Sequence, residues 1–89
     1  MKIKLELFGA SRDFSEKDHL NLKLQNKASI DDLRNEIIKY IDNKFSGNEN
    51  FIKVVKSSAF CSENNEIISD NYKITKDQKI GIIPPIGGG

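Results

Sequence analysis

The spacing of the apolar residues changes at Ser29, and this change restricts the possible folds more than any other feature of the sequence. Before it, apolar side chains occupy alternate positions in residues 2–8 and again in residues 20–24, which is the period of half-buried β-strands. The small and turn-prone residues between them, 9–18, favour an open loop. The first part of the chain is therefore predicted to be an antiparallel hairpin.

A helix is predicted to begin at Ser29 and to end near Lys44. Ser29 is a favourable N-cap, and the acidic residues after it would meet the unpaired N–H groups of the first turn. Apolar residues then follow at helical spacing: Ile30, Leu33, Ile37, Ile38 and Ile41. The polar residues predicted to point outward are Arg34, Glu36, Lys39 and Asp42.

The remaining segments complete the pattern of an α+β domain. Residues 51–55 and 59–61 are short apolar clusters, each predicted as a strand or as the turn before one, and residues 67–74 are predicted as turns with a few inward side chains. The β-branched run at 79–83 is predicted as the last, central strand. This order favours one main helix packed across a mixed sheet whose first and last strands are parallel neighbours, which is the β-grasp (ubiquitin-like) fold.

Length and charge exclude several classes of protein. A chain of 89 residues can bury one modest core but not two. The 14 Lys and Arg residues are balanced by 13 Asp and Glu residues and scattered among them, so we expect no binding to nucleic acid or membranes. The single cysteine, Cys61, and the lack of a leader or membrane-spanning stretch favour the cytoplasm. We expect no metal site and no chemical role for Cys61 or His19.

The sequence ends in PPIGGG, an ending that a folded core does not need. Pro84 and Pro85 favour an extended conformation, and residues 84–89 would reach on the order of 20 Å. Glycine leaves the terminal carboxylate of Gly89 unhindered, but a carboxylate must be activated before a sulfur nucleophile or a lysine can attack it. We therefore predict a domain at 1–83 and a flexible reactive tail at 84–89.

Three motifs resemble the small subunit of molybdopterin synthase and, more broadly, the MoaD/ThiS family of ubiquitin-like sulfur carriers. Residues 8–13, FGASRD, resemble that family's Phe-Ala-x-x-Arg-Glu after its first strand, and residues 29–33, SIDDL, resemble its helix start. Residues 80–89, IGIIPPIGGG, resemble its last strand and its Pro-Pro-x-x-Gly-Gly ending. Gly87 stands where the family usually has Ala, Ser or Thr, which is compatible with another type of carrier.

The resemblance implies a sulfur carrier in molybdenum cofactor biosynthesis. An E1-like adenylating enzyme would activate Gly89 with ATP, and sulfur from a persulfide donor would replace the AMP to give a thiocarboxylate. The tail would then enter the large subunit of molybdopterin synthase and donate sulfur to a cyclic pterin precursor. The protein would hold no cofactor permanently and would be the sulfur-donating subunit of a sulfurtransferase complex, not a catalyst alone. The implied site residues are Gly88 and Gly89 at the reactive end and Arg12, Pro84, Pro85, Ile86 and Gly87 for partner binding.

Three other hypotheses remain open. The chain could be a sulfur carrier of another pathway, such as thiamine synthesis or tRNA thiolation. It could be a ubiquitin-like modifier whose activated tail is joined to lysines. It could also be a non-catalytic β-grasp interaction module with an incidental glycine ending.

Overall fold

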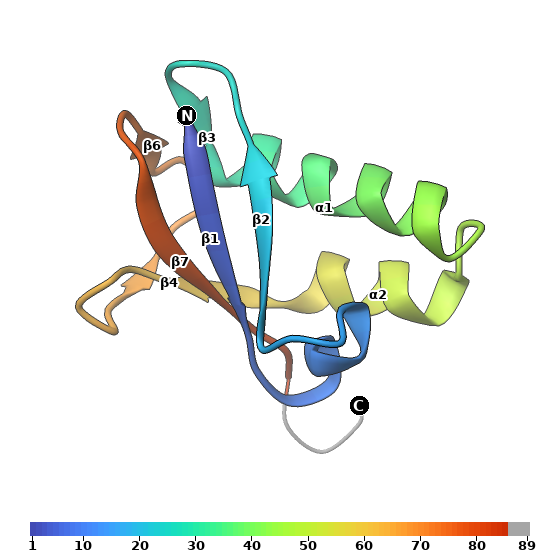
Figure 1. Cartoon of the computed structure of the whole chain (residues 1–89). Helices are drawn as coiled ribbons and strands as arrows, with labels where there is room; N and C mark the ends of the chain where they lie inside the picture. Colours follow the sequence, from blue (N-terminus) through green and yellow to red (C-terminus); the bar gives the residue numbers. More distant parts are fainter. Residues whose placement is uncertain (86–89) are drawn as a thin grey trace.

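The computed structural model describes residues 1–85, and Ile86, Gly87, Gly88 and Gly89 lie outside the described residues. A five-stranded sheet has the order β2-β1-β7-β4-β5, and β3 and β6 form a second, two-stranded sheet (Figure 1). The strands are β1 Lys2–Leu7, β2 His19–Lys23, β3 Ala28–Ser29, β4 Ala59–Cys61, β5 Ile67–Ile68, β6 Lys73–Ile74 and β7 Gln78–Ile83. The helices are the 3-10 helix η1 Gly9–Phe14 and the α-helices α1 Ile30–Lys44 and α2 Glu49–Ser57.

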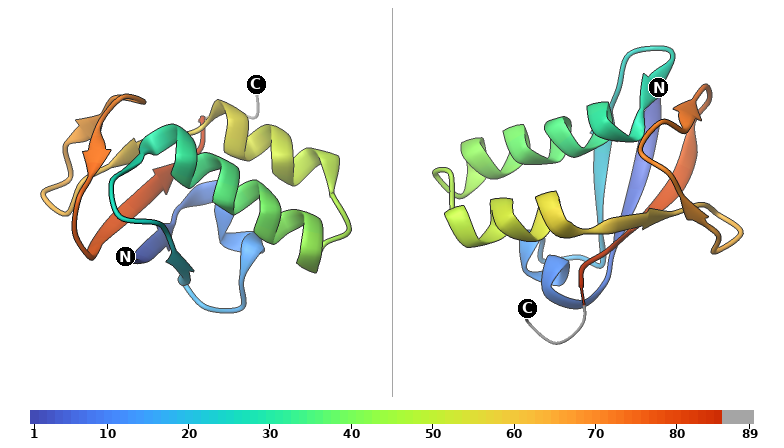
Figure 2. Two further views of the ribbon diagram at one scale, coloured as in Figure 1. Left: turned by 90° about the horizontal axis from the view of Figure 1, so that it is seen from above. Right: turned by 180° about the vertical axis from the view of Figure 1, so that it is seen from behind.

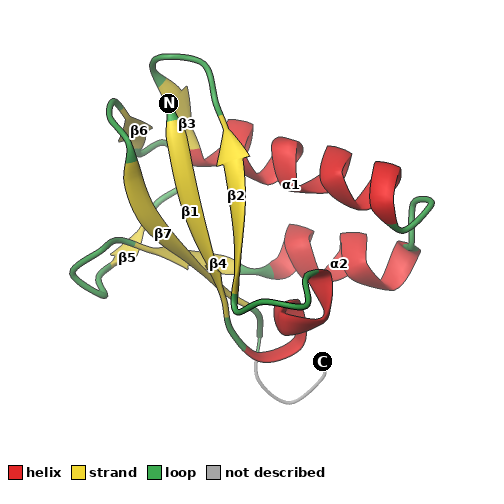
Figure 3. Ribbon diagram, viewed as in Figure 1, coloured by secondary structure: helices red, strands yellow, loops and turns green. Residues whose placement is uncertain are grey.

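The predicted strand arrangement is confirmed. β1 pairs antiparallel with β2, in a register that places Leu5 opposite Leu20, and parallel with β7, in a register that places Leu5 opposite Ile80. β7 pairs with β4 on its other side, so it lies inside the sheet between two neighbours. The sheet is thus mixed, with its first and last strands adjacent (Figure 3).

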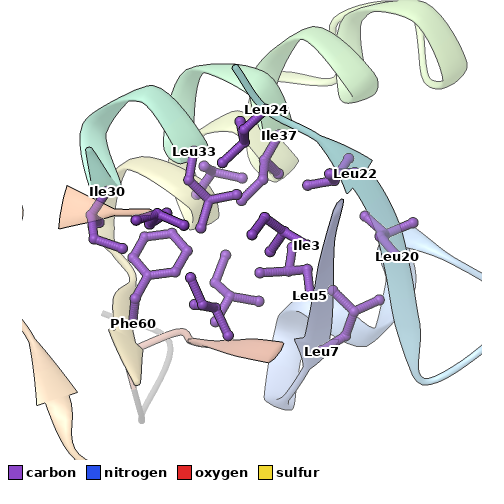
Figure 4. Close-up of a cluster of buried hydrophobic side chains, with 14 of the residues drawn as sticks. Ile3, Leu5, Leu7, Leu20, Leu22, Leu24, Ile30, Leu33, Ile37 and Phe60 are labelled. Carbon is purple, nitrogen blue, oxygen red and sulfur yellow. The ribbon is translucent and has the colours of Figure 1, made fainter. Parts of the chain in front are cut away.

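The core lies between the sheet and the helices. Figure 2 shows α1 and α2 on the same face of the five-stranded sheet, and no helix of residues 1–85 covers the opposite face. We call this free side the outer face. Inward side chains from β1, β2, α1, β4 and β7 meet in one cluster (Figure 4). The buried members include Ile3, Leu5, Leu7, Leu22, Leu33, Ile37, Ile41, Phe60, Ile80 and Ile82.

The start of α1 is fixed by reciprocal hydrogen bonds. The Ser29 hydroxyl accepts from the Asp32 backbone N–H at 3.0 Å, and the Asp32 carboxylate accepts from the Ser29 backbone N–H at 2.9 Å. This capping box satisfies two N–H groups that the helix leaves unpaired. The bonds from Ser29 also lower the pKa of Asp32 below its ordinary value of 3.8.

We expect the substitution Asp32→Asn to weaken the pH dependence of stability. Because the folded-state pKa of Asp32 is lowered, its stabilisation is present above pH 3.8 and is lost as the pH falls through the lowered value. Unfolding midpoints of parent and variant, measured from neutral pH to about pH 2, should converge on the acid side. Asp31→Asn removes a carboxylate from the same turn without touching the capping box. If both variants gave the same pH profile, the cap would not be the cause.

Three segments differ from the sequence-based expectation. Residues 51–55 lie within the helix α2, not in a strand or turn, because Asn48 caps the helix and Val55 reaches the core. The loop at 9–18 is partly ordered as η1, whose Phe14 is fully buried. The stretch 67–74 contains the short strands β5 and β6.

Within residues 1–85, no helix combines the length and the apolar character that crossing a membrane requires. In the same part of the chain, no three His, Cys, Asp or Glu side chains gather closely enough to hold a metal ion.

Candidate functional site

The start of the predicted tail lies at the end of the sheet where β1 and β7 both finish. These strands are parallel, so η1, which follows β1, lies beside the residues that follow β7 (Figure 1). Pro84 is buried and Pro85 is exposed. Gly9, at the start of η1, has a φ of +54°, and a Cβ added there would lie 3.9 Å from the Pro84 ring. Pro84 therefore lies close to the start of η1. We call Pro84 and Pro85 the tail base.

A hollow of about 300 Å³ adjoins the tail base. Ala10 of η1 and Lys53 and Val54 of α2 line it together with Pro84 and Pro85. Because α2 is not a predicted element, this hollow has no signal in the sequence beyond the apolar residues at 51–55. It offers space for a partner's side chain next to the tail base. The predicted reactive residues Gly88 and Gly89, and the predicted contacts Ile86 and Gly87, lie outside the described residues.

Phe8 is an exposed aromatic residue on the outer face near this end of the sheet. Its side chain is 43% exposed although it follows a strand with a buried face. A Cβ added at Gly81 would lie 2.9 Å from Phe8 Cε2 and 2.7 Å from Cys61 Sγ. Gly81 thus lets the Phe8 ring and the Cys61 thiol lie against the backbone of β7. Sequence reasoning missed this role of Gly81 because the contact joins residues of β7 and β4 with the residue that follows β1.

Phe8 belongs to a larger apolar strip on the outer face. Ile80 and Ile82 point into the core, so Gly81 and Ile83 point outward, and the strand pairing places Cys61 opposite both Gly81 and Ile67. Ile67 is 66% exposed. We define the outer apolar strip as Phe8, Ala59, Cys61, Ile67, Gly81 and Ile83. It runs across β7, β4 and β5 and reaches the tail base. Phe8, Ala59 and Ile67 are its exposed members, Ile83 is half-buried, and Cys61 and Gly81 are buried.

The structure brings some of the predicted site residues together. Arg12 lies exposed on η1, at the same end of the domain as Pro84 and Pro85. Cys61 is 6% exposed, and β1 and β7 lie between its strand and that of His19. The His19 ring instead lies 2.9 Å from the Asp18 carboxylate and lowers the pKa of Asp18.

Beside the apolar strip, the outer face carries an ion pair. Lys79 Nζ lies 2.9 Å from Glu6 Oε1, and this hydrogen bond raises the pKa of Lys79 above its ordinary value of 10.5. Lys79 therefore stays cationic at neutral pH. The polar part of the outer face lies over β1 and β2 and the apolar part over β4, β5 and the end of β7.

Two of the solved structures that resemble this chain match it over the whole domain, whereas no protein-family model and no curated protein matches it. The first, from Pyrococcus furiosus, is provisionally assigned as molybdopterin converting factor subunit 1. It has a TM-score of 0.68 at 22% sequence identity, over 96% of this chain and 98% of that one. The second is SAMP1 from Haloferax volcanii, with a TM-score of 0.67 at 12% identity over 100% of both chains. The strand order, the single long helix and these two likenesses together show that the chain has the ubiquitin-like β-grasp fold.

Proposed function

We propose that this protein is a sulfur carrier that works through the carboxylate of Gly89, as the small subunit of molybdopterin synthase. One observation carries the proposal. The central strand β7 ends at Ile83, and the chain then passes through the tail base toward three glycines at an end of the sheet that offers an exposed aromatic ring and a hollow. A domain whose last strand leads at this end into two prolines and then into glycines is suited to be a substrate of other enzymes.

The chemistry follows from the weakness of a carboxylate as an electrophile. An oxygen of the Gly89 carboxylate would attack the α-phosphorus of ATP on an E1-like partner, which releases pyrophosphate and leaves an acyl-adenylate. The terminal sulfur of a persulfide would then attack the acyl carbon and expel AMP. A thiol would cleave the resulting S–S bond and leave the thiocarboxylate. Glycine at 88 and 89 keeps the path to the acyl carbon free of side chains.

The tail base and the outer apolar strip supply a docking surface for these partners. Phe8 and Ile67 are large exposed apolar side chains, and aromatic side chains are frequent anchors of protein interfaces. Arg12 lies on η1, the helix that directly follows Phe8. A likeness to a protein assigned as molybdopterin converting factor subunit 1 supports the large subunit of molybdopterin synthase as the acceptor. The same proposal implies a persulfide as the sulfur donor and a cyclic pterin precursor as the sulfur acceptor.

The mass of the intact protein tests the proposal directly. In protein purified from its native host, we expect a fraction whose mass has risen by the replacement of one oxygen by one sulfur at Gly89. Fragment spectra should assign the change to the peptide that ends in Gly89, and treatment with an alkylating reagent should label that peptide through its thiocarboxylate. As a control, the digest should separate the peptide that contains Cys61 from the peptide that ends in Gly89, because both peptides carry sulfur.

The outcome separates the proposal from the other hypotheses. Conjugates of the tail with lysines of other proteins would favour a modifier. A thiocarboxylate with no transfer to a pterin precursor would favour thiamine synthesis or tRNA thiolation. Protein whose terminal carboxylate is never altered would contradict the carrier function and favour an interaction module.

A further inference from the structure

The strand β2 has a free hydrogen-bonding edge. It is the terminal strand of the five-stranded sheet and pairs only with β1 among the described residues. It spans five residues, His19–Lys23, and is therefore long enough to pair with another strand. Unpaired strand edges are templates for the addition of an extended segment.

The register identifies the groups on this edge. Leu24 N–H donates to the Met1 carbonyl, the Met1 amino group donates to the Leu24 carbonyl, and Leu7 N–H donates to the Asp18 carbonyl. In an antiparallel pair the bonded positions alternate, so Leu20 and Leu22 also bond toward β1. The backbone N–H and C=O groups that face away from β1 belong to His19, Asn21 and Lys23.

Two separate hollows adjoin this edge, each lined by residues of β2 and of α1. At one end, a hollow of about 550 Å³ is lined by Lys23 and Leu24 on the sheet side and by Asn35 on α1. At the other end, a hollow of about 430 Å³ is lined by His19 and, from α1, by Tyr40. Open space therefore borders the edge at both of its ends.

The side chains on the two sides of β2 differ in chemistry. On the core side, Leu20, Leu22 and Leu24 are 7%, 8% and 8% exposed, and they form the margin of the hydrophobic cluster (Figure 4). On the outer face, the register sets Lys2 directly opposite Lys23, with Lys4 opposite Asn21. Like charges that face each other across strands are destabilising, so the pair formed by Lys2 and Lys23 favours an anionic neighbour.

We propose that β2 binds an extended segment of a partner protein in which apolar and acidic residues alternate. The segment would add a sixth strand to the sheet. Its apolar side chains would cover the leucines on the core side, and its acidic side chains would meet Lys2, Lys4 and Lys23 on the outer face. A second copy of the chain is a poor occupant because it would bring the same lysines together. The inference does not rest on the sulfur-carrier proposal, since it involves neither the tail base nor the glycines.

The test uses the full chain and a blocked peptide of about eight residues that alternates valine with glutamate. Backbone amide exchange is followed by NMR with and without the peptide. We expect the amides of His19, Asn21 and Lys23 to exchange more slowly when the peptide is bound, because they gain acceptors. The amides of Leu20 and Leu22, which already bond to β1, should change little. A peptide that alternates valine with lysine should bind at least about tenfold more weakly.

The substitution Asn21→Pro removes the central outward N–H and places proline on the free side of an edge strand, where it is tolerated. We expect it to weaken binding at least about tenfold, whereas Asn21→Ala, which keeps the N–H, should bind like the parent. A peptide with alternate amides N-methylated is the second test. It leaves the protein unchanged and so remains decisive if Asn21→Pro does not fold.

Several results would overturn the proposal. Binding that survives both Asn21→Pro and N-methylation would exclude strand addition, and equal binding of the two peptides would exclude charge recognition. Peptide contacts confined to Phe8 and Ile67 would assign binding to the outer apolar strip. Protection of the β2 amides that rises with protein concentration, without peptide, would make a second copy the occupant. A failure of the acidic peptide to bind would also reject it.

Discussion

Deletion of Gly89 should abolish sulfur loading and leave the free energy of unfolding unchanged within about 0.5 kcal/mol. The hydrophobic core of the described residues ends with β7, before the tail base, so we expect the deletion to remove no core contact. Removing one residue draws the terminal carboxylate back by about 3.5 Å. Since a misplacement of about 1 Å can cost about 10²-fold in rate, loading should fall by at least that factor. The measurements are thermal unfolding and ATP-dependent adenylate formation with an E1-like partner.

Two variants serve as controls for the deletion. Asn26→Ala changes an exposed residue in the loop after β2 and should preserve both stability and loading. Gly88→Ala keeps the length of the tail and adds one methyl group, so it should load poorly only if the receiving channel is narrow. Normal loading of the Gly89 deletion would exclude the proposed mechanism. Normal loading of the full chain without transfer to a pterin precursor would keep the carrier function and assign it to another sulfur pathway.

The parts of the fold that could be predicted from the sequence depend on local rules. Alternation in β1 and β2 follows from the two faces of a strand, and the start of α1 follows from the Ser29 hydroxyl and the Asp32 carboxylate. The parallel neighbours β1 and β7 required one further step, which is that a long helical connection permits a parallel crossover.

The helix α2 was missed because local propensity and tertiary contacts disagree there. Its middle contains Ile52, Val54 and Val55, whose branched side chains favour strands. The ring of Phe51 packs 5.2 Å from that of Phe14 and 5.0 Å from that of Phe45, and these long-range contacts favour the helix. Asn48, which accepts a hydrogen bond from Phe51 N–H, was the one local signal for its start.

The candidate site was predictable only in part, for a similar reason. Proline and glycine composition marks the tail and the tail base in the sequence. The contact of Gly81 with Phe8 and Cys61 depends on strand register, and the hollow beside Pro84 depends on α2. Neither feature has a local pattern in the sequence, so a resemblance in motifs indicates the reactive end but not the surface around it.

The prediction for Arg34 was wrong. Among the polar residues of the described domain, we expect its replacement to destabilise the fold most clearly. Arg34 was predicted to point outward from α1, but its side chain is only 12% exposed. Its guanidinium donates to the carbonyls of Val55 at 2.8 Å and Ser58 at 2.9 Å, at the end of α2. It also donates to Asp70 at 2.8 Å and lies 5.0 Å from the centre of the Phe60 ring. One cation thereby joins α1, the end of α2, β4 and the segment after β5.

We expect Arg34→Ala to lower the free energy of unfolding by about 3 kcal/mol, measured by urea denaturation. The change leaves at least two partly buried carbonyls without their donor, at a cost of about 1–3 kcal/mol each, while the loss of the Asp70 pair adds little because Asp70 is 72% exposed. Arg34→Lys should recover only part of the loss, since one ammonium lacks the planar fork that reaches Val55, Ser58 and Asp70 together.

Lys39→Ala provides the matched control, because Lys39 lies on the same helix with a 73% exposed side chain and a long 3.8 Å pair to Glu36. Its effect should stay within about 0.5 kcal/mol. Equal stability of Arg34→Ala and Lys39→Ala would mean that water replaces the guanidinium at the carbonyls without cost. Full recovery by Arg34→Lys would mean that charge alone, not the arrangement of the donors, holds the end of α2 against α1. A large loss of unfolding free energy for Arg34→Ala, with partial recovery by Arg34→Lys, would support a role of this long-range contact in holding α2 in place. No local sequence pattern predicts this contact. The position of α2 in turn determines the hollow beside the tail base.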